Sequence, residues 1–265
     1  MAGNPDNLHT FVVCAYKDSE YLEPLIDSLL AQSARSGILI STSTPADSIY
    51  KTAAKYGLSV SVNPDGGSIG ADWSFAYTLA DTDLVTLAHQ DDIYEPDYTE
   101  KVLAAYAKAK NPILIYTNYY EIRPEGRVTK NRLLKVKALM NAPIRAFPKS
   151  RFVRNRVFSM GCPILCPSVA YNKKRFPDFA FARDMKTNLD WDAWYRLAKE
   201  PGEFLYIRDR LVGHRIHEGS ETSGGIATGA RTAEDLEMFR RYWPEGCARL
   251  IHRFYSKGLE SNRTD

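Results

Sequence analysis

The stretch that decides the fold runs from Leu84 to Tyr98 and reads LVTLAHQDDIYEPDY. Its first part is a short apolar, β-branched run, which is typical of a buried strand in a parallel sheet. We expect this strand over residues 83–88, stopping at His89-Gln90-Asp91-Asp92, and a helix over residues 98–108. Two adjacent carboxylates therefore follow directly after a buried strand.

On either side of this stretch, strands and helices alternate along the chain. The expected strands are at residues 8–15, 38–42, 58–62 and 112–117, and the expected helices at 21–32, 47–56 and 71–79. This order predicts an α/β fold with an open, mostly parallel sheet flanked by helices. Such sheets bind ligands at the carboxyl ends of their strands. Ala15 and Tyr16 should therefore share a rim with the loop from His89 to Asp92.

The second half of the chain has a less regular pattern. We expect a helix at 190–197, a strand at 203–208, a Gly- and Ser-rich loop at 213–225, and a cationic helix or helix pair at 231–257. We find neither an internal repeat nor a low-complexity linker. The sequence therefore predicts one compact domain over residues 1–225 and a cationic helical tail over residues 226–265.

Composition narrows the class of protein further. The 265 residues are 44% hydrophobic and 25% charged, which is typical of a globular domain. No apolar run reaches the ~18 residues that span a bilayer, and the N-terminus does not resemble a signal peptide. We therefore expect a cytoplasmic protein. Its four cysteines are then expected to be reduced thiols: Cys14, Cys162, Cys166 and Cys247.

Positive charge is concentrated in one segment. Residues 126–177 contain no Asp or Glu but many Lys and Arg residues. Such a block indicates an anionic partner, such as a diphosphate, a lipid headgroup layer or a nucleic acid, or else a solvated surface balanced by acidic neighbours. No nucleic-acid recognition motif accompanies it, so no nucleic-acid partner is expected.

Three segments carry side chains suited to chemistry. Adjacent carboxylates such as Asp91 and Asp92 repel each other, and a divalent cation with hard oxygen ligands offsets that cost, although one Asp could simply cap a helix. His214-Arg215-Ile216-His217 offers imidazole and guanidinium groups for a metal or a phosphate. Asp190 opens a helix and could act as a general base, although Asn188 or Asp190 could simply cap that helix.

The motifs of several other enzyme classes are missing. The sequence contains no Gly-x-x-x-x-Gly-Lys-Ser/Thr loop of a P-loop NTPase and no Gly-x-Ser-x-Gly nucleophile elbow. Ala15-Tyr16-Lys17-Asp18 stands where a dinucleotide-binding protein would carry its Gly-rich turn.

Taken in order, five segments resemble the family 2 inverting glycosyltransferases of the GT-A fold. They are FVVCAYKDSEYLEPLIDSLLAQ, LVTLAHQDDIYEPDY, GCPILCPSVAYNKKRF, NLDWDAWYRL and HRIHEGSETS. They look like the opening strand and helix, the Asp-x-Asp loop, an acceptor-side segment, the segment with the catalytic base, and the closing loop of that family. The resemblance covers roughly residues 8–225, with residues 1–117 as the nucleotide-sugar half and 118–225 as the acceptor half and closing loop.

The resemblance implies a role for individual residues. Asp91 would coordinate Mn²⁺ or Mg²⁺ at the donor phosphates, and His217 would reach the metal or the diphosphate. Asp190 would be the base that deprotonates the acceptor hydroxyl. The remaining donor contacts would come from Ala15, Tyr16, Ser41, Asp72, His89, Gln90 and Arg215. The implied partners are a nucleotide-diphosphate sugar and a glycan or lipid-linked acceptor, with peripheral contact to an anionic membrane at its inner face.

The sequence departs from the family pattern at three places. His89 stands where the first Asp of Asp-x-Asp is expected, and Leu189 precedes Asp190 where Glu is common. The Asp expected after the second strand is replaced by the hydroxyl-rich Ile38–Thr44, which makes Asp72 a candidate substitute. An inactive sugar- or nucleotide-binding module is therefore an alternative, and a sugar-phosphate nucleotidyltransferase is another.

Overall fold

A computed structural model of the protein describes residues 8–217 and 230–261. The first part of the chain alternates strands and helices as the sequence predicted. In order these elements are β1 (His9–Ala15), α1 (Leu22–Leu30), β2 (Gly37–Thr42), α2 (Asp47–Tyr56), β3 (Val60–Val62), α3 (Ile69–Leu79), β4 (Leu84–His89), β5 (Ile93–Tyr94) and α4 (Tyr98–Lys108). β5 was not predicted, and the predicted bounds of the others match the observed elements to within a few residues at each end.

The described strands form one sheet in the order β3-β2-β1-β4-β8 (Val169–Asn172)-β6 (Pro112–Arg123)-β9 (Glu203–Arg215)-β5, and β7 (Gly126–Val128) pairs with β6. The strands β3, β2, β1 and β4 are parallel to one another, which confirms the predicted parallel α/β sheet. Nearly every residue of β1 is buried, because helices cover both faces of the sheet at this strand. The rim formed by the carboxyl ends of β1 and β4 brings Cys14 opposite His89.

The strands of the second half are mixed in direction. They are β6 (Pro112–Arg123), β7 (Gly126–Val128), β8 (Val169–Asn172) and β9 (Glu203–Arg215). The short strand β8 lies between β4 and β6 and is antiparallel to both, whereas β6 and β9 are parallel. Both β6 and β9 extend beyond their predicted ends, so that His214 and Arg215 lie in a strand and not in the predicted loop from Gly213 to Gly225.

The helices of the second half are α5 (Arg132–Ala146), α6 (Arg151–Phe158), α7 (Leu189–Leu197), α9 (Ala230–Arg240) and α10 (Glu245–Ser261). The sequence analysis did not predict α5 and α6. Their start signals are present, because the side chain of Asn131 accepts a hydrogen bond from Leu134 N at 2.8 Å and Ser150 accepts one from Val153 N. Among the described residues, no helix is both long and apolar enough to cross a membrane.

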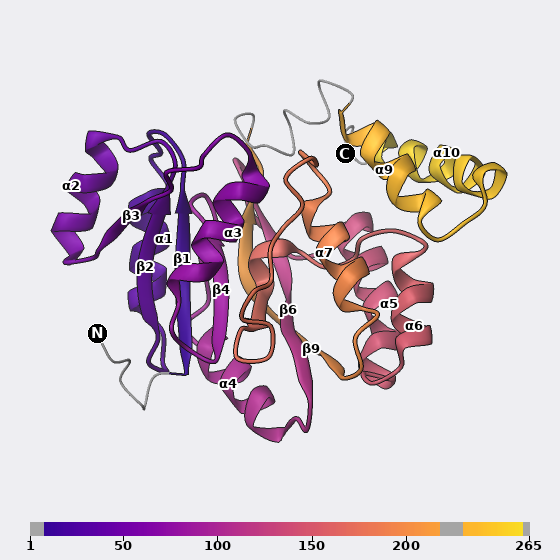
Figure 1. Ribbon diagram of the computed structural model, residues 1–265, viewed down its shortest axis with the longest axis horizontal. Helices are drawn as coiled ribbons and strands as arrows, with labels where there is room; N and C mark the ends of the chain where they lie inside the picture. The colour runs from indigo at the N-terminus through magenta and orange to yellow at the C-terminus, as the bar shows by residue number, and fades with distance from the viewer. Residues whose placement is uncertain (1–7, 218–229, 262–265) are drawn as a thin grey trace.

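The sheet separates two hydrophobic cores. Phe11 and Val13 of β1 face one core, with residues of α1, α2 and α4, while Val12 faces the other, with residues of α3 and α7. A third, smaller core joins Leu189 and Trp191 of α7 to Met238 and Phe239 of the C-terminal helices. In Figure 1, α9 and α10 (yellow) lie at the opposite end of the long axis from α2.

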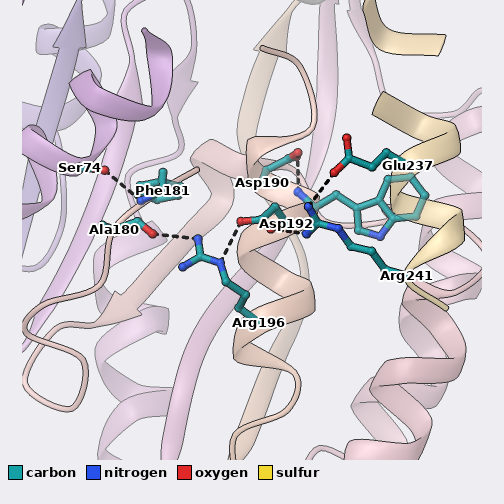
Figure 2. Close-up of polar contacts among 9 residues, drawn as sticks. Ser74, Ala180, Phe181, Asp190, Asp192, Arg196, Glu237 and Arg241 are labelled. Carbon is teal, nitrogen blue, oxygen red and sulfur yellow. Dashed lines mark hydrogen bonds and ion pairs between the residues drawn. The ribbon is translucent and has the colours of Figure 1, made fainter. Parts of the chain in front are cut away.

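A polar cluster attaches the C-terminal helices to α7. Arg241, which follows α9, pairs with the buried carboxylate of Asp192, and Arg196 pairs with the same carboxylate at 2.8 Å. Figure 2 shows Asp192 between these two guanidinium groups. Arg196 also donates to the carbonyl of Ala180, and the neighbouring Phe181 N donates to Ser74 of α3. These contacts connect α7 with α3 on one side and with the C-terminal helices on the other.

Candidate active site

The carboxyl ends of β1 and β4 are joined by a reciprocal pair of hydrogen bonds. Tyr16 N donates to Gln90 Oε1 at 2.8 Å, and Gln90 Nε2 donates to Tyr16 O at 3.0 Å. The Tyr16 side chain is exposed, whereas Ala15 is buried at the end of β1. The structure therefore brings Ala15, Tyr16 and Gln90 together at the predicted rim.

Asp72 belongs to the same rim, although it comes from α3. Its carboxylate accepts hydrogen bonds from Ser43 Oγ and from Asn63 Nδ2, both at 2.7 Å. Ser43 directly follows β2, where the acidic donor contact of the family is absent, and Asn63 directly follows β3. Ser41, the residue predicted for donor contact, is only 3% exposed within β2. Ser43 is half-buried at the carboxyl end of β2 and is a second candidate for that contact.

The close approach of α3 to the acceptor half depends on Gly70. A Cβ at this position would lie 1.9 Å from the carbonyl oxygen of Ala182, so no larger residue fits without moving the backbone. This packing fixes the start of α3 and with it Asp72 and Trp73. The Trp73 ring lies 5.0 Å from the imidazole of His89 and holds that side chain on the rim.

Three side chains at the carboxyl end of β4 and directly after it converge on one point. His89, Asp91 and Asp92 each offer one ligand atom, and these atoms lie within 4.8 Å of one another. His89 Nε2 and Asp92 Oδ2 are buried and have no hydrogen-bond partner among the described residues. Buried polar atoms are normally satisfied. One imidazole nitrogen and two carboxylates are donors that Mn²⁺ or Mg²⁺ accepts, so these residues fit a divalent cation.

The end of β9 supports this cluster from the opposite side. β5 pairs with β9 and places Ile93 opposite Gly213. Asp92 Oδ1 then receives hydrogen bonds from His214 Nδ1 and Arg215 N, both at 3.0 Å. The Arg215 guanidinium donates to the Asp91 carbonyl and lies over the Tyr21 ring. These contacts hold the end of β9 against the segment that contains Asp91 and Asp92.

His217 also reaches the predicted metal ligand. Its Nε2 lies 3.0 Å from Asp91 Oδ2, although 126 residues separate the two in the chain. The structure thus brings together Asp91 and His217, the two residues that were predicted to serve the metal. The rest of the predicted closing loop, from Glu218 to Gly225, lies outside the described residues.

The charges in this cluster depend on one another. Burial favours a neutral carboxyl, but His89, the hydrogen bond from His217 and the nearby His214 together lower the pKa of Asp91. Burial lowers the pKa of His89, which favours the neutral imidazole that can bind a metal. Although burial opposes it, the Asp92 carboxylate raises the pKa of His214.

Asp190 lies in the first turn of α7 (Figure 2). Its Oδ1 accepts a hydrogen bond from Trp191 N at 2.7 Å, and its Oδ2 lies 3.8 Å from Cys162 Sγ. Among the described residues, it forms no ion pair. Burial raises its pKa, against the opposing effects of Trp191 N, Arg231, Lys137 and His89. A carboxylate of this kind can accept a proton at neutral pH.

Asn188 is the N-cap residue of α7, but its side chain does not cap the helix. Side-chain capping by Asn188 was one of the alternatives that the sequence left open. The Asn188 side chain makes no capping hydrogen bond and donates instead to Asp235 at 2.8 Å. Glu234 of α9 accepts the backbone N–H groups of Lys186, Thr187 and Asn188. The C-terminal helix therefore holds the loop that leads to Asp190.

The roles predicted from the sequence omitted three residues of the site: Asp92, His214 and Trp73. Asp92 and His214 stand in segments that were named as candidates for metal or phosphate binding, but neither received a role of its own. Asp92 is fully buried and central to the cluster. Its adjacency to Asp91, together with two histidines in HRIH, was the available signal. Trp73 gave no signal, because an aromatic residue in a helix is usually part of the core.

Comparison with known proteins agrees with this geometry. The sequence profile described as Glycosyl transferase family 2 matches residues 10–176, which is more than half of the chain. The chain belongs to glycosyl transferase family 2. This glycosyltransferase matches no curated protein sequence.

Solved structures of glycosyltransferases share its fold. Staphylococcus aureus TarS 1-349, in complex with UDP-GlcNAc, has a TM-score of 0.65 at 14% identity, over 92% of this chain and 70% of TarS 1-349. The mannosyltransferase PcManGT from Pyrobaculum calidifontis, in complex with GDP-Man and Mn²⁺, has a TM-score of 0.64 at 11% identity, over 92% and 68% of the two chains.

A third structure is glucosyl-3-phosphoglycerate synthase from Mycobacterium tuberculosis, in complex with Mn²⁺ and UDP-glucose. It has a TM-score of 0.58 at 14% identity, over 89% of this glycosyltransferase and 79% of the synthase. At such low identities these likenesses establish the fold, and they confirm the predicted GT-A-like architecture.

Proposed function

We propose that this glycosyltransferase moves a sugar from a nucleotide-diphosphate donor to a hydroxyl acceptor with inversion at the anomeric carbon. The observation that carries the proposal is the convergence of His89, Asp91 and Asp92 at the rim, with Asp190 on the acceptor side. This reaction requires a cation site that holds the diphosphate and a carboxylate that accepts a proton. His89, Asp91 and Asp92 offer the first. Asp190, which forms no ion pair with a described residue, offers the second.

The donor would lie across the carboxyl ends of β1, β2 and β4. Tyr16 and Gln90 border the nucleotide side, and Asp72 with Ser43 offers hydrogen-bonding groups to a ribose. His89, Asp91 and Asp92 would hold Mn²⁺ or Mg²⁺, which supplies electrostatic stabilisation to the departing diphosphate. Arg215 and His217 add positively charged or hydrogen-bonding groups from β9 and the residues that follow it.

Asp190 would act as the general base. Its carboxylate accepts the proton of the acceptor hydroxyl while the acceptor oxygen forms a bond to the anomeric carbon. The bond between that carbon and the phosphate oxygen breaks, and the nucleoside diphosphate leaves with the electron pair. Attack on the face opposite the leaving group inverts the configuration. Complexes of three neighbours with UDP-GlcNAc, GDP-Man and UDP-glucose support this donor class.

A thermal-shift screen tests the proposal. UDP-, GDP-, CMP- and dTDP-sugars are added with and without Mn²⁺, and a ligand at ~100-fold over its dissociation constant should add about 2.7 kcal/mol of stability. We expect a shift with one nucleotide that needs the metal and disappears in Asp91→Ala. Asp97→Ala is the control, because Asp97 is paired with Lys101 away from the site. Metal-independent shifts, or shifts that persist in Asp91→Ala, would contradict the proposal.

We also propose that the enzyme works at the inner face of an anionic membrane. Helices α5, α6 and α10 lie at the same end of the molecule (Figure 1). Each exposes a large apolar side chain: Leu139 is 74% exposed, Phe152 71% and Phe254 69%. Exposed cations flank them, including Lys135, Arg151 and Arg253. Apolar side chains between cations are typical of surfaces that bind anionic lipid headgroups.

Vesicle sedimentation tests the membrane proposal. We expect the protein to bind vesicles that contain phosphatidylserine, to bind phosphatidylcholine vesicles weakly, and to lose binding as salt increases. Phe152→Ser should weaken binding without lowering the melting temperature. Leu30→Ser is the control, because Leu30 is also exposed but lies on α1. Equal binding to both vesicle types at every salt concentration would contradict the proposal.

A further inference from the structure

A buried nitrogen at the carboxyl end of β4 has no hydrogen-bond partner among the described residues. It is Nε2 of His89, the last residue of the strand. Oδ2 of Asp92 is also buried, and no described residue donates a hydrogen bond to it. Buried polar atoms are normally satisfied, because leaving one without a partner costs free energy. A cation that accepts both a nitrogen and a carboxylate oxygen would offset this cost.

The other two histidines of the site lie against carboxylates. His214 Nδ1 lies 3.0 Å from Asp92 Oδ1, and His217 Nε2 lies 3.0 Å from Asp91 Oδ2. The ring of His89 instead contributes a ligand atom to the group that it forms with Asp91 and Asp92, whose three atoms lie within 4.8 Å of one another. Of the three rings, that of His89 is therefore the best placed to bind a cation directly.

The packing around His89 holds its side chain in place. In the sheet, His89 lies opposite Cys14 of β1. The ring of Trp73, from α3, lies 5.0 Å from the imidazole, with an angle of 34° between the two planes. Trp73 in turn packs edge-on against Phe181, with 5.3 Å between the ring centres. The strand and the aromatic neighbour thus fix the imidazole independently of any ligand, so a nitrogen ligand at this position is preorganised.

A nitrogen ligand changes which cation a site prefers. Mg²⁺ prefers oxygen ligands and is usually bound by carboxylates, water and phosphate oxygens. Imidazole suits first-row transition ions, and the affinity of a site with nitrogen and oxygen ligands rises from Mn²⁺ to Co²⁺. The family pattern has Asp at the position of His89, so this chain has lost one anionic oxygen ligand and gained a nitrogen. That exchange weakens the binding of Mg²⁺ more than the binding of Mn²⁺ or Co²⁺.

We propose that His89 sets the metal specificity of this enzyme, so that the site selects Mn²⁺ or Co²⁺ over Mg²⁺. The inference rests on the proposed function, because it takes His89, Asp91 and Asp92 as the cation site for the donor diphosphate. It also explains the departure from the family pattern at His89 as a change of metal preference and not as a loss of activity.

Calorimetry with the full chain tests the inference. The nucleoside diphosphate identified by the donor screen is titrated into the protein in the presence of excess Mg²⁺, Mn²⁺ or Co²⁺. We expect the nucleotide to bind about tenfold more tightly with Mn²⁺ than with Mg²⁺, and more tightly again with Co²⁺. In His89→Asp the affinity with Mg²⁺ should increase. The three affinities should then agree within about threefold, as expected for a site of oxygen ligands.

Electron spin echo spectroscopy of the Mn²⁺ complex gives a second readout that does not depend on affinity. The nitrogen nucleus of a coordinated imidazole modulates the echo of the bound Mn²⁺. We expect this modulation in the unchanged protein, its loss in His89→Asp and its persistence in His217→Asn. Modulation that persists in His89→Asp would assign the nitrogen to another residue and overturn the inference.

Matched variants separate ligand chemistry from misfolding. His89→Asn removes the imidazole without adding a charge, and it should abolish the preference for Mn²⁺ and Co²⁺ even if His89→Asp does not fold. His252→Asn is the control, because it removes an imidazole from α10, where the ring packs near Phe239 and lies 3.2 Å from Ser256 Oγ. This control should bind the nucleotide with the same order of metals as the unchanged protein.

Equal nucleotide affinity with the three metals in the unchanged protein would overturn the inference. A preference that survives both substitutions of His89 would overturn it as well. A protein that binds no nucleoside diphosphate with any of the metals contradicts the proposed function instead, so one series of titrations distinguishes the two failures.

Discussion

His214 Nδ1 lies 3.0 Å from Oδ1 of Asp92, a carboxylate that is completely buried. The other oxygen of Asp92 has no partner in the described part of the chain, and Asp92 belongs to the group of residues that could hold a cation. His214 thus orients a candidate ligand carboxylate from a strand that lies 122 residues away in the chain. Residues that form hydrogen bonds with a metal ligand orient that ligand and change its basicity.

Loss of this hydrogen bond should weaken metal binding. We expect His214→Ala to reduce Mn²⁺ affinity about 10–100-fold, as is usual for residues that support a metal ligand. His214→Asn, which keeps an N–H donor near the position of Nδ1, should recover part of the loss. Titration of Mn²⁺ in the presence of saturating nucleotide measures both. Equal affinity in the Ala variant and the unchanged protein would show that Asp92 needs no such support.

Asp190 should govern turnover and not donor binding. We expect Asp190→Asn to reduce the turnover number by roughly 10²–10⁴, the usual range for loss of a general base, with the nucleotide affinity unchanged. Asp184→Asn is the control, because Asp184 is exposed in the loop before α7. A variant that keeps its turnover would exclude Asp190 as the base.

The dependence of rate on pH should report the same group. The base acts when deprotonated, so the rate should fall as pH decreases through the pKa of Asp190, which burial raises above the ordinary aspartate range. Arg231 lowers that pKa, so Arg231→Gln should move the acidic limb to higher pH. A limb that stays in place, or moves to lower pH, would contradict the assignment.

The pair between Arg241 and Asp192 should stabilise the docked C-terminal helices. Arg241→Met leaves a buried carboxylate with Arg196 as its remaining cation among the described residues, and we expect a loss of about 1–3 kcal/mol in the free energy of unfolding. Urea denaturation measures the change. Arg240→Met is the matched control, because Arg240 pairs with Glu245 at the exposed surface and should contribute little. Equal effects of the two variants would rule out a special role for Asp192.

Glu234 should make the stability of the protein depend on pH. Although burial opposes it, the N–H groups of Lys186, Thr187 and Asn188 hold its pKa below the ordinary value. A lowered pKa in the folded state means that the stabilisation is present above the unfolded value and is lost as pH falls through the folded value. Glu234→Gln should cost about 1 kcal/mol at neutral pH, allowing for solvent screening.

The difference between Glu234→Gln and the unchanged protein should therefore shrink as pH falls below about 4, near the ordinary glutamate pKa. Urea denaturation at a series of pH values measures it. A difference that is constant with pH would mean that the substitution destabilises the protein for steric reasons and not through loss of charge.

The parallel half of the sheet was predictable because its signals are local. The buried run from Leu84 to His89 and the helical period of α2 and α4 can each be read within a dozen residues. The rim position of Tyr16 and Asp91 then follows from the rule that ligands bind at the carboxyl ends of parallel strands. The strand β8 was not predictable as the neighbour of β4, because antiparallel insertion depends on contacts between distant segments.

The sequence alone determined the fold class, the rim and the identity of Asp91, Asp190 and His217 as residues of interest, because short-range patterns of polarity encode strands, helices and their ends. Only the tertiary structure decided which side chains meet. Burial of Asp92, its hydrogen bond from His214, and the hydrogen bonds from the loop before Asp190 to Glu234 arise where β9 and α9 pack against elements far away in the chain. Such contacts depend on packing in three dimensions, which no local pattern records.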